Sequence, residues 1–187
     1  MRFFGSRRTS RTSGARTDDV DVDLSGADLE AVLLAGSVGE VAGVRPVPVT
    51  RERVSAWMDS CGFTYFVDSD GDLGGMWHGR LFYFLVLGSG GEVLQVRGQW
   101  HREATIERLG EVLELCNEWN AEHIWPKTYA RVRDDGAVVV CAETTVSLEH
   151  GASDAQLGQL LHCGLSTGAM FFEHLDRYFV DPLQVAS

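Results

Sequence analysis

The sequence predicts an α+β fold, in which an antiparallel β-sheet of about five to six strands carries helices mainly on one face. Three observations support this class. Segments with the two-residue period of strands fall into a group of four and a group of two. Segments with the 3.6-residue period of helices lie before, between and after these groups. Short turn sequences join neighbouring strands, so the predicted order is α-ββββ-α-ββ-α.

Charge and composition divide the 187 residues into four parts. We expect a disordered tail over residues 1–23, basic and then acidic, and a short helix with an extended linker over 24–49. The folded domain is expected over 50–181, with a C-terminal tail over 182–187. Five arginines lie in residues 1–16, which leaves 11 basic against 27 acidic residues in the rest of the chain. Such an acidic body repels phosphate and argues against nucleic-acid binding.

Two features favour the cytoplasm as the location. No window approaches the ~18 consecutive apolar residues of a membrane span, so no membrane partner is expected. The first residues lack the apolar core of a secretory signal.

The four cysteines lie far apart and form no Cys-x-x-Cys pair, which indicates free thiols.

The domain is predicted to begin with a helix after Thr50, a residue type that favours the N-cap position. Apolar or small residues follow at helical spacing, namely Val54, Trp57, Met58 and Cys61. Gly62 is predicted to end this helix, because glycine readily adopts the left-handed conformation that follows many helices.

Four strands are expected next: Phe63–Val67, a strand that runs to Trp77, Leu81–Leu87 and Leu94–Trp100. The last of these alternates apolar and polar residues, so one of its faces should contact solvent. Leu81–Leu87 is instead apolar on both faces and needs a cover on each side. The second cover is expected to be the first helix, residues 25–49 folded back, or a second subunit. The third option predicts a homodimer.

A second helix is predicted over residues 105–120, because its apolar residues repeat at helical spacing. Two strands, 128–132 and 137–146, follow it. The sequence Arg133-Asp-Asp-Gly lies between them, and Asp-Gly between two strand-like segments is a strong signal for a hairpin turn.

A long final helix is predicted from Ser153, where Gln156 completes a capping box. Its apolar stripe runs to Phe179 and includes Gly164 and Gly168. Because glycine destabilises a helix interior, we expect another backbone to pack closely against these two positions.

Asp68, Asp70 and Asp72 have the spacing with which calcium-binding loops begin. A complete EF-hand loop has Gly at position 6 and Glu at position 12, where this sequence has Leu73 and Gly79. A hairpin turn through the same residues is the favoured interpretation, and a calcium-binding module is the weaker alternative. No cofactor is predicted, and no metal site beyond these three weak candidates.

The segment Gly164-Leu-Ser-Thr-Gly168 matches the Gly-x-Ser-x-Gly pattern of hydrolases. It lies within a predicted helix and not on a strand-to-helix turn, and only 21 residues follow Ser166. We therefore interpret the match as chance. The histidines show no metal-ligand spacing, and the sole lysine, Lys127, lies outside any glycine-rich phosphate loop. No catalytic residue is predicted.

Six residues are candidates for contact with a protein partner. They are Trp119, Asn120, Trp125, Lys127, Tyr83 and Leu85. The first four surround the predicted end of the second helix. They either anchor a helix-to-strand corner, through buried indole rings and amide hydrogen bonds, or form the wall of a groove that holds a peptide.

Several short motifs occur together and in order. They are Asp-Gly-Asp-Leu-Gly-Gly-x-Trp, Leu-Phe-Tyr-Phe, Val-Leu-Gln-Val-Arg-Gly-x-Trp, Cys-Asn-x-Trp-Asn, Ile-Trp-Pro-Lys and Leu-Glu-His-Gly. Over residues 46–181 the chain resembles YbjN-domain proteins, in particular their longer, actinobacterial-type branch. The resemblance implies a fold similar to type III secretion chaperones and a role as a sensory transduction regulator. It supplies no catalytic residues.

The resulting hypothesis is a non-enzymatic, cytoplasmic regulatory or chaperone-like protein that binds another polypeptide and forms a homodimer. The acidic body suits a basic segment of the partner, and the arginines of residues 1–16 can occupy the same surface when no partner is bound. The alternative is a small-ligand-binding protein or an enzyme whose pocket is not visible in the sequence.

Overall fold

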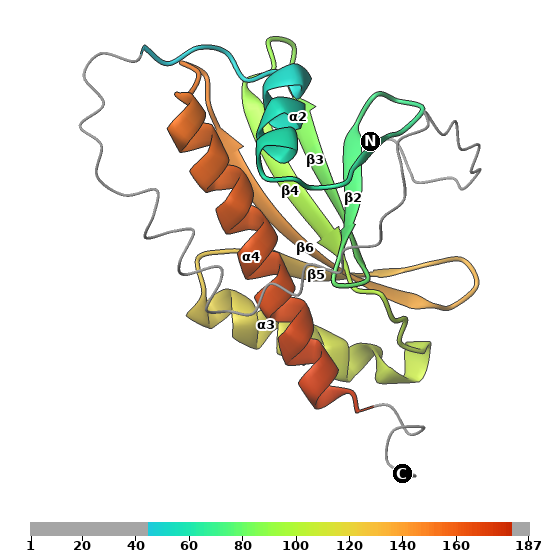
Figure 1. Cartoon of the computed structure of the whole chain (residues 1–187). Coiled ribbons are helices and arrows are strands. Elements are labelled where there is room, and N and C mark those ends of the chain that lie inside the picture. Colours follow the sequence, from blue (N-terminus) through green and yellow to red (C-terminus); the bar gives the residue numbers. More distant parts are fainter. Residues whose placement is uncertain (1–44, 181–187) are drawn as a thin grey trace. The chain divides into compact units, whose positions relative to one another are not determined.

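A computed structural model describes residues 45–180, which form a six-stranded antiparallel sheet with three helices on one face (Figure 1). The predicted α+β class and element order are confirmed. The predictions for the tail, for the short helix before residue 45 and for the last residues of the chain lie outside the described residues.

The helices are α2 (Arg51–Ser60), α3 (Leu109–Glu122) and α4 (Asp154–Tyr178), with a 3₁₀ turn, η1 (Ile106–Arg108), before α3. The strands are β1 (Phe66–Val67), β2 (Leu73–Trp77), β3 (Arg80–Leu87), β4 (Val93–Gln99), β5 (Lys127–Val132) and β6 (Val138–Ser147). They lie in the order β1-β2-β3-β4-β6-β5, and every neighbouring pair is antiparallel. β4 and β6 therefore pair although α3 and β5 separate them in the sequence.

One face of this sheet, here called the inner face, packs against the helices. The register aligns Phe84, Val96 and Thr144 across three strands on this face, and all three are buried. Side chains alternate between the two faces of a strand, so the residues between them lie on the opposite, outer face. The helices bury their apolar stripes against the inner face, through residues such as Met58, Val112, Leu161, Phe171 and Phe172.

α2 begins and ends where the sequence predicts. The hydroxyl of Thr50 accepts a hydrogen bond from the backbone N–H of Arg53 at 3.3 Å, as an N-cap does. Gly62 follows the helix with a φ of +72°, in the left-handed region that glycine favours. Val54 and Met58 are fully buried.

α4 has the predicted capping box: the Ser153 hydroxyl accepts from the Gln156 N–H at 3.1 Å, and the Gln156 side chain accepts from the Ser153 N–H at 2.9 Å. The partners predicted for its two glycines were wrong. A Cβ at Gly164 would lie 2.7 Å from the Val96 side chain, and one at Gly168 would lie 2.9 Å from the Phe82 ring. Side chains of the sheet, and not a second backbone, fill the space that these glycines leave.

No helix between residues 45 and 180 is both long enough and apolar enough to cross a bilayer. α4, with 25 residues, is the longest of them, and its charged residues Asp154, Glu173, Asp176 and Arg177 lie near its two ends.

The first strand is shorter than predicted. Only Phe66–Val67 joins the sheet, opposite Leu73 and Gly74. The N–H of Phe63 instead bonds to the Met58 carbonyl at 2.9 Å, so the chain still follows the end of α2 at this point. The Phe63 ring lies 5.6 Å from the rings of both Trp57 and Trp77. Phe63 therefore packs in the core between α2 and the sheet, and strand pairing begins only at Phe66.

The first helix does not cover the second face of β3, so this option among the predicted covers is wrong. α2 lies over the inner face (Figure 1). Its Trp57 ring lies 6.4 Å from the ring of Phe84 on that face. An amphipathic helix buries one stripe only, and the stripe of α2 faces the side that also holds α4. Within residues 45–180 no helix lies on the outer face.

Candidate functional site

The corner between α3 and β5 holds four of the six predicted binding residues. The Asn120 side chain donates from Nδ2 to the Thr128 carbonyl at 2.8 Å and accepts from the Thr128 N–H at 2.9 Å. The Thr128 hydroxyl donates to the Cys116 carbonyl at 3.1 Å. Lys127 Nζ lies 3.4 Å from the Asn120 carbonyl oxygen. The Asn120 amide thus pairs with the backbone of β5 as a neighbouring strand would.

Trp119 lies in the core, with 8% of its surface exposed. Its ring stacks on His123 at 3.9 Å between centroids and lies 5.2 Å from the Phe171 ring. Its indole N–H is buried and has no acceptor among the described residues. Trp125, next to a cis peptide bond to Pro126, is half-buried. This placement favours the anchored corner over the groove wall, and a role in binding stays a prediction.

Tyr83 and Leu85 lie on the outer face of β3, opposite Arg97 and Gln95 of β4. Leu85 is buried and Tyr83 half-buried. The Tyr83 ring meets the exposed Phe66 ring edge to face at 5.8 Å. Partial burial, followed by the nearby negative charges of the Asp68–Asp72 turn, raises the pKa of Tyr83.

A polar network crosses the outer face beside these residues. The Arg97 guanidinium forms a close ion pair with Glu143 and donates to the Gln95 side chain at 2.9 Å. Gln95 in turn donates to the Thr145 hydroxyl at 2.9 Å. The Tyr129 hydroxyl donates to Glu143 at 2.5 Å. Burial and this bond to a carboxylate raise the pKa of Tyr129 well above its ordinary value.

The sequence indicated neither Arg97 nor Glu143 as members of one network. Arg97 and Glu143 are opposite each other in the register of β4 and β6. These strands lie far apart in the chain, so no local pattern predicts which of their residues meet. The available sequence signal for this pair was that one predicted strand carries a basic residue and the other an acidic one.

The Asp68–Asp72 segment forms the favoured hairpin turn. Asp68 accepts at one carboxylate oxygen from the N–H groups of Asp70 at 3.0 Å and Asp72 at 2.9 Å. Gly71 has a φ of +82°, as the tight turn requires. Asp72 pairs with Arg51 at 2.9 Å. No group of three His, Cys, Asp or Glu side chains in the described part of the chain is placed to hold a metal ion.

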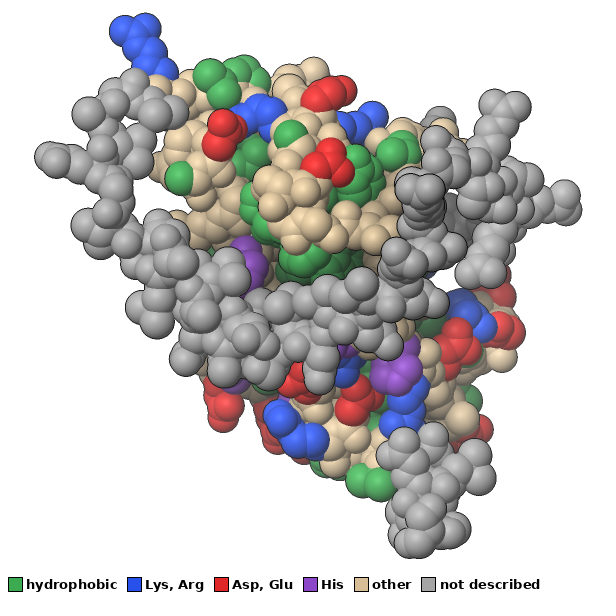
Figure 2. Space-filling model, in the orientation of Figure 1, with side chains coloured by type: hydrophobic (Ala, Val, Ile, Leu, Met, Phe, Trp, Pro, Cys, Tyr) green, Lys and Arg blue, Asp and Glu red, His purple; other side chains and the backbone are tan. Residues whose placement is uncertain are grey.

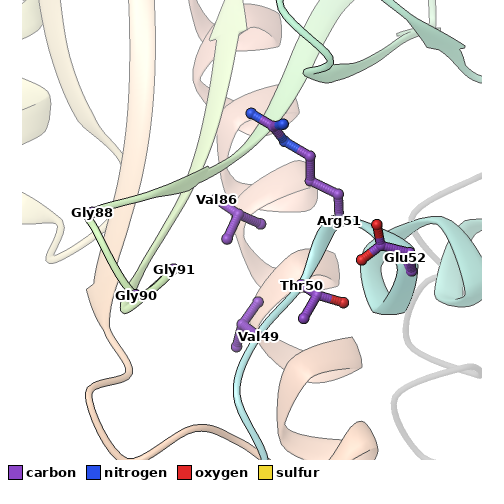
Figure 3. Close-up of a pocket in the computed structure, with 8 residues that line it drawn as sticks. All are labelled: Val49, Thr50, Arg51, Glu52, Val86, Gly88, Gly90 and Gly91. Atoms are coloured by element: carbon purple, nitrogen blue, oxygen red, sulfur yellow. The ribbon is translucent and has the colours of Figure 1, made fainter.

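A shallow depression of about 400 Å³ lies between the start of α2 and the turn after β3 (Figure 3). Its lining residues are Val49, Thr50, Arg51, Glu52, Val86, Gly88, Gly90 and Gly91. The hydroxyl of Thr50 already caps α2, and Arg51 points toward Asp72. Hydrogen bonds at the start of the helix, chiefly from the backbone, lower the pKa of Glu52. The depression holds no paired acid and base for catalysis.

Ser166 lies inside α4, as the chance interpretation of its motif predicts. Its hydroxyl donates to the carbonyls of His162 at 2.9 Å and Cys163 at 3.2 Å, one turn earlier in the same helix. Burial lowers the pKa of the nearby His162. This serine therefore satisfies its hydrogen bonds within the helix and lies on no strand-to-helix turn.

The helix side of the molecule carries much of its acidic charge. Acidic side chains gather over α3 and the η1 turn before it (Figure 2), where Glu107, Glu114, Glu118 and Glu122 are exposed. None of these four forms an ion pair within the described residues. Glu111, on the same helix, pairs with Arg108 at 2.8 Å. This surface matches the predicted preference for a basic partner segment, which stays a prediction.

Three comparisons with known proteins bear on this fold. The comparison with curated proteins gave no match. A crystal structure of "YbjN, a putative transcription regulator from E. coli" matches with a TM-score of 0.62 and 12% identity, covering 71% of this chain and 96% of that one. A structure of an "uncharacterized protein from Methanothermobacter thermautotrophicus" matches with a TM-score of 0.50 and 8% identity, covering 70% and 99%. At these identities the structural matches establish the fold alone.

The comparison with protein families covers most of the folded region. The YbjN family, described as "Putative bacterial sensory transduction regulator", matches residues 50–177. This range begins at the cap of α2 and ends one residue before the end of α4, so it covers the other helices and strands described above completely and α4 almost completely. The chain belongs to the YbjN family.

Proposed function

We propose that this protein is a non-enzymatic regulator that works in the cytoplasm and binds another polypeptide through the outer face of its sheet. The observation that carries this proposal is a cluster of apolar side chains on a face that no described helix covers. Phe66 and Met76 are exposed there, and Met76 lies opposite Leu81 in the ladder. Clustered exposed apolar surface is typical of protein–protein contacts. The family description as a regulator is consistent with this role.

A second copy of the chain is one partner that this face suits. In a two-fold homodimer the same surface meets itself, so an apolar cluster on one copy finds an apolar cluster on the other. Arg97 and Glu143 already neutralise each other on this face. Burying these two side chains at a dimer interface would therefore leave neither of their charges unpaired.

Two methionines offer a matched test of the binding face. Met76 on the outer face is 59% exposed, and Met170 on α4 is 54% exposed. Because both side chains are largely in solvent, Met76→Glu and Met170→Glu should leave folding intact. We expect tagged Met76→Glu protein to capture about tenfold less partner from native lysate than the wild type, because the added carboxylate would be buried at the interface. Met170→Glu should capture the wild-type amount.

The same variants test the homodimer. Sedimentation should show a dimer for the wild type and for Met170→Glu, and a monomer for Met76→Glu. Equal capture by both variants would contradict the outer face as the binding surface. A wild-type monomer at micromolar concentration would rule out the homodimer but leave another polypeptide as partner.

A further inference from the structure

One edge of the sheet leaves main-chain groups without a partner among residues 45–180. β5 is the last strand on this side (Figure 1). Val138 of β6 exchanges both backbone hydrogen bonds with Ala104, at 2.8 and 3.0 Å, so its N–H and C=O point away from β5. Backbone groups alternate in direction along a strand. The register then turns the N–H and C=O of Thr128, Ala130 and Val132 toward the outside of the sheet.

Asn120 shows that this edge accepts a partner. Its side-chain amide forms hydrogen bonds with both the C=O and the N–H of Thr128, at 2.8 and 2.9 Å. The corresponding groups of Ala130 and Val132 have no hydrogen-bond partner within residues 45–180. The first outward position of the edge is therefore hydrogen-bonded, and the next two have no partner in the described part of the chain.

The side chains around the open edge determine which segment would fit. Val132 is 50% exposed. Leu113 of α3, at 43%, precedes Asn120 by seven residues and so lies on the same flank of the helix, beside β5. Arg131 points to the outer face, between the two open positions, and forms no ion pair within the described residues.

We propose that the Ala130–Val132 edge pairs with an extended segment of a partner polypeptide that reads apolar–acidic–apolar. This inference rests on the proposed function, because it adds a second contact to the binding of another polypeptide. The apolar side chains would meet Val132 and Leu113 on the inner side. The acidic side chain would lie opposite Arg131 on the outer face, where cross-strand pairs of opposite charge are stabilising.

A second copy of this chain fits the edge poorly. Antiparallel pairing about a two-fold axis between Ala130 and Val132 would place Arg131 opposite the same arginine of the other copy. Like charges directly opposite in neighbouring strands are destabilising. The edge therefore selects a different segment, whereas the outer face suits either partner.

Two labelled peptides test this inference on the full chain, one centred on Thr-Val-Glu-Val-Thr and the other on Thr-Val-Lys-Val-Thr. We expect the glutamate peptide to bind the wild type about fivefold tighter than the lysine peptide. The glutamate would attract Arg131, whereas the lysine would repel it. Arg131→Glu should reverse this order. Arg177→Glu, at an exposed arginine on α4, is the matched control and should leave the order unchanged.

A proline variant tests the backbone pairing itself. Ala130→Pro removes only an outward N–H, which an edge strand tolerates, and should weaken both peptides by about tenfold or more. In wild-type NMR spectra the amide signals of Ala130 and Val132 should shift on peptide addition, and their hydrogens should exchange more slowly.

Equal affinity for the two peptides, unmoved amide signals, or unchanged binding by Ala130→Pro would each overturn the edge assignment. A dimeric wild type together with a monomeric Ala130→Pro variant would overturn it too, since a second copy would then occupy the edge. The methionine variants test the outer face separately.

Discussion

Tyr129 places its hydroxyl 2.5 Å from Glu143, which also holds Arg97. One carboxylate therefore receives a phenol from β5 and a guanidinium from β4, the two strands that flank β6 in the sheet. Such side chains hold the outer face together, where no helix of residues 45–180 lies above them. The sequence shows Tyr129 only as a strand residue, because its partner depends on the register of the folded sheet.

The raised pKa of Tyr129 predicts a pH dependence of stability. Below pH 10, the ordinary value for tyrosine, the neutral hydroxyl donates to Glu143 and its stabilisation is fully present. As the pH rises above 10 toward the raised folded-state pKa, this contribution is lost, because the unfolded tyrosine ionises more easily than the folded one. The slope should stay below about 1.4 kcal/mol per pH unit, since Tyr129 is only half-buried and solvent screens the interaction.

Urea unfolding at a series of pH values checks this expectation. Tyr129→Phe should be less stable than the wild type at pH 7, and the difference should narrow above pH 10. Tyr178→Phe removes an exposed phenol without a hydrogen bond to the described residues and serves as the control. A constant difference between wild type and Tyr129→Phe from pH 7 to 11 would refute the pKa shift.

At the scale of elements, the sequence predicts the long periodic segments well. The capping box of α4 and the cap of α2 appear as expected, because local residues alone form them. The short β1 was not predictable, since the Phe63 ring packs against Trp57 of α2 and Trp77 of β2, and these contacts depend on how the helix docks on the sheet. The corner between α3 and β5 is intermediate. Asn120 was a candidate there, but its pairing with Thr128 depends on how the helix docks beside the sheet.

The helix-to-strand corner yields a stability prediction. Asn120→Ala removes both bonds to the Thr128 backbone and leaves its N–H and C=O unpaired at the edge of the core. We expect a loss of about 1–3 kcal/mol in the free energy of unfolding. Asn117→Ala, at an exposed asparagine one turn earlier in α3, should change it by less than about 0.5 kcal/mol. Equal effects of the two substitutions in urea unfolding would show that the amide does not fix the corner.

At the scale of the whole molecule, one sheet separates two different surfaces. The helix side carries the exposed glutamates of α3 (Figure 2), and the outer face carries the apolar cluster around Met76. Sequence reasoning anticipated that β3 needed a second cover, because both of its faces are apolar. It could not assign that cover, since the side on which α2 packs depends on contacts with α4 and not on the stripe of α2 itself.

The central claim is that the outer face binds another polypeptide, and methyl NMR of methionine-labelled protein tests it most directly. Met58 is fully buried, Met76 lies on the outer face and Met170 lies on the helix side, so three of the four methionines in the chain report three locations. When the polypeptide captured from lysate is added, the methyl signal of Met76 should shift or broaden while those of Met58 and Met170 stay in place. A shift at Met170 with an unmoved Met76 would contradict the account.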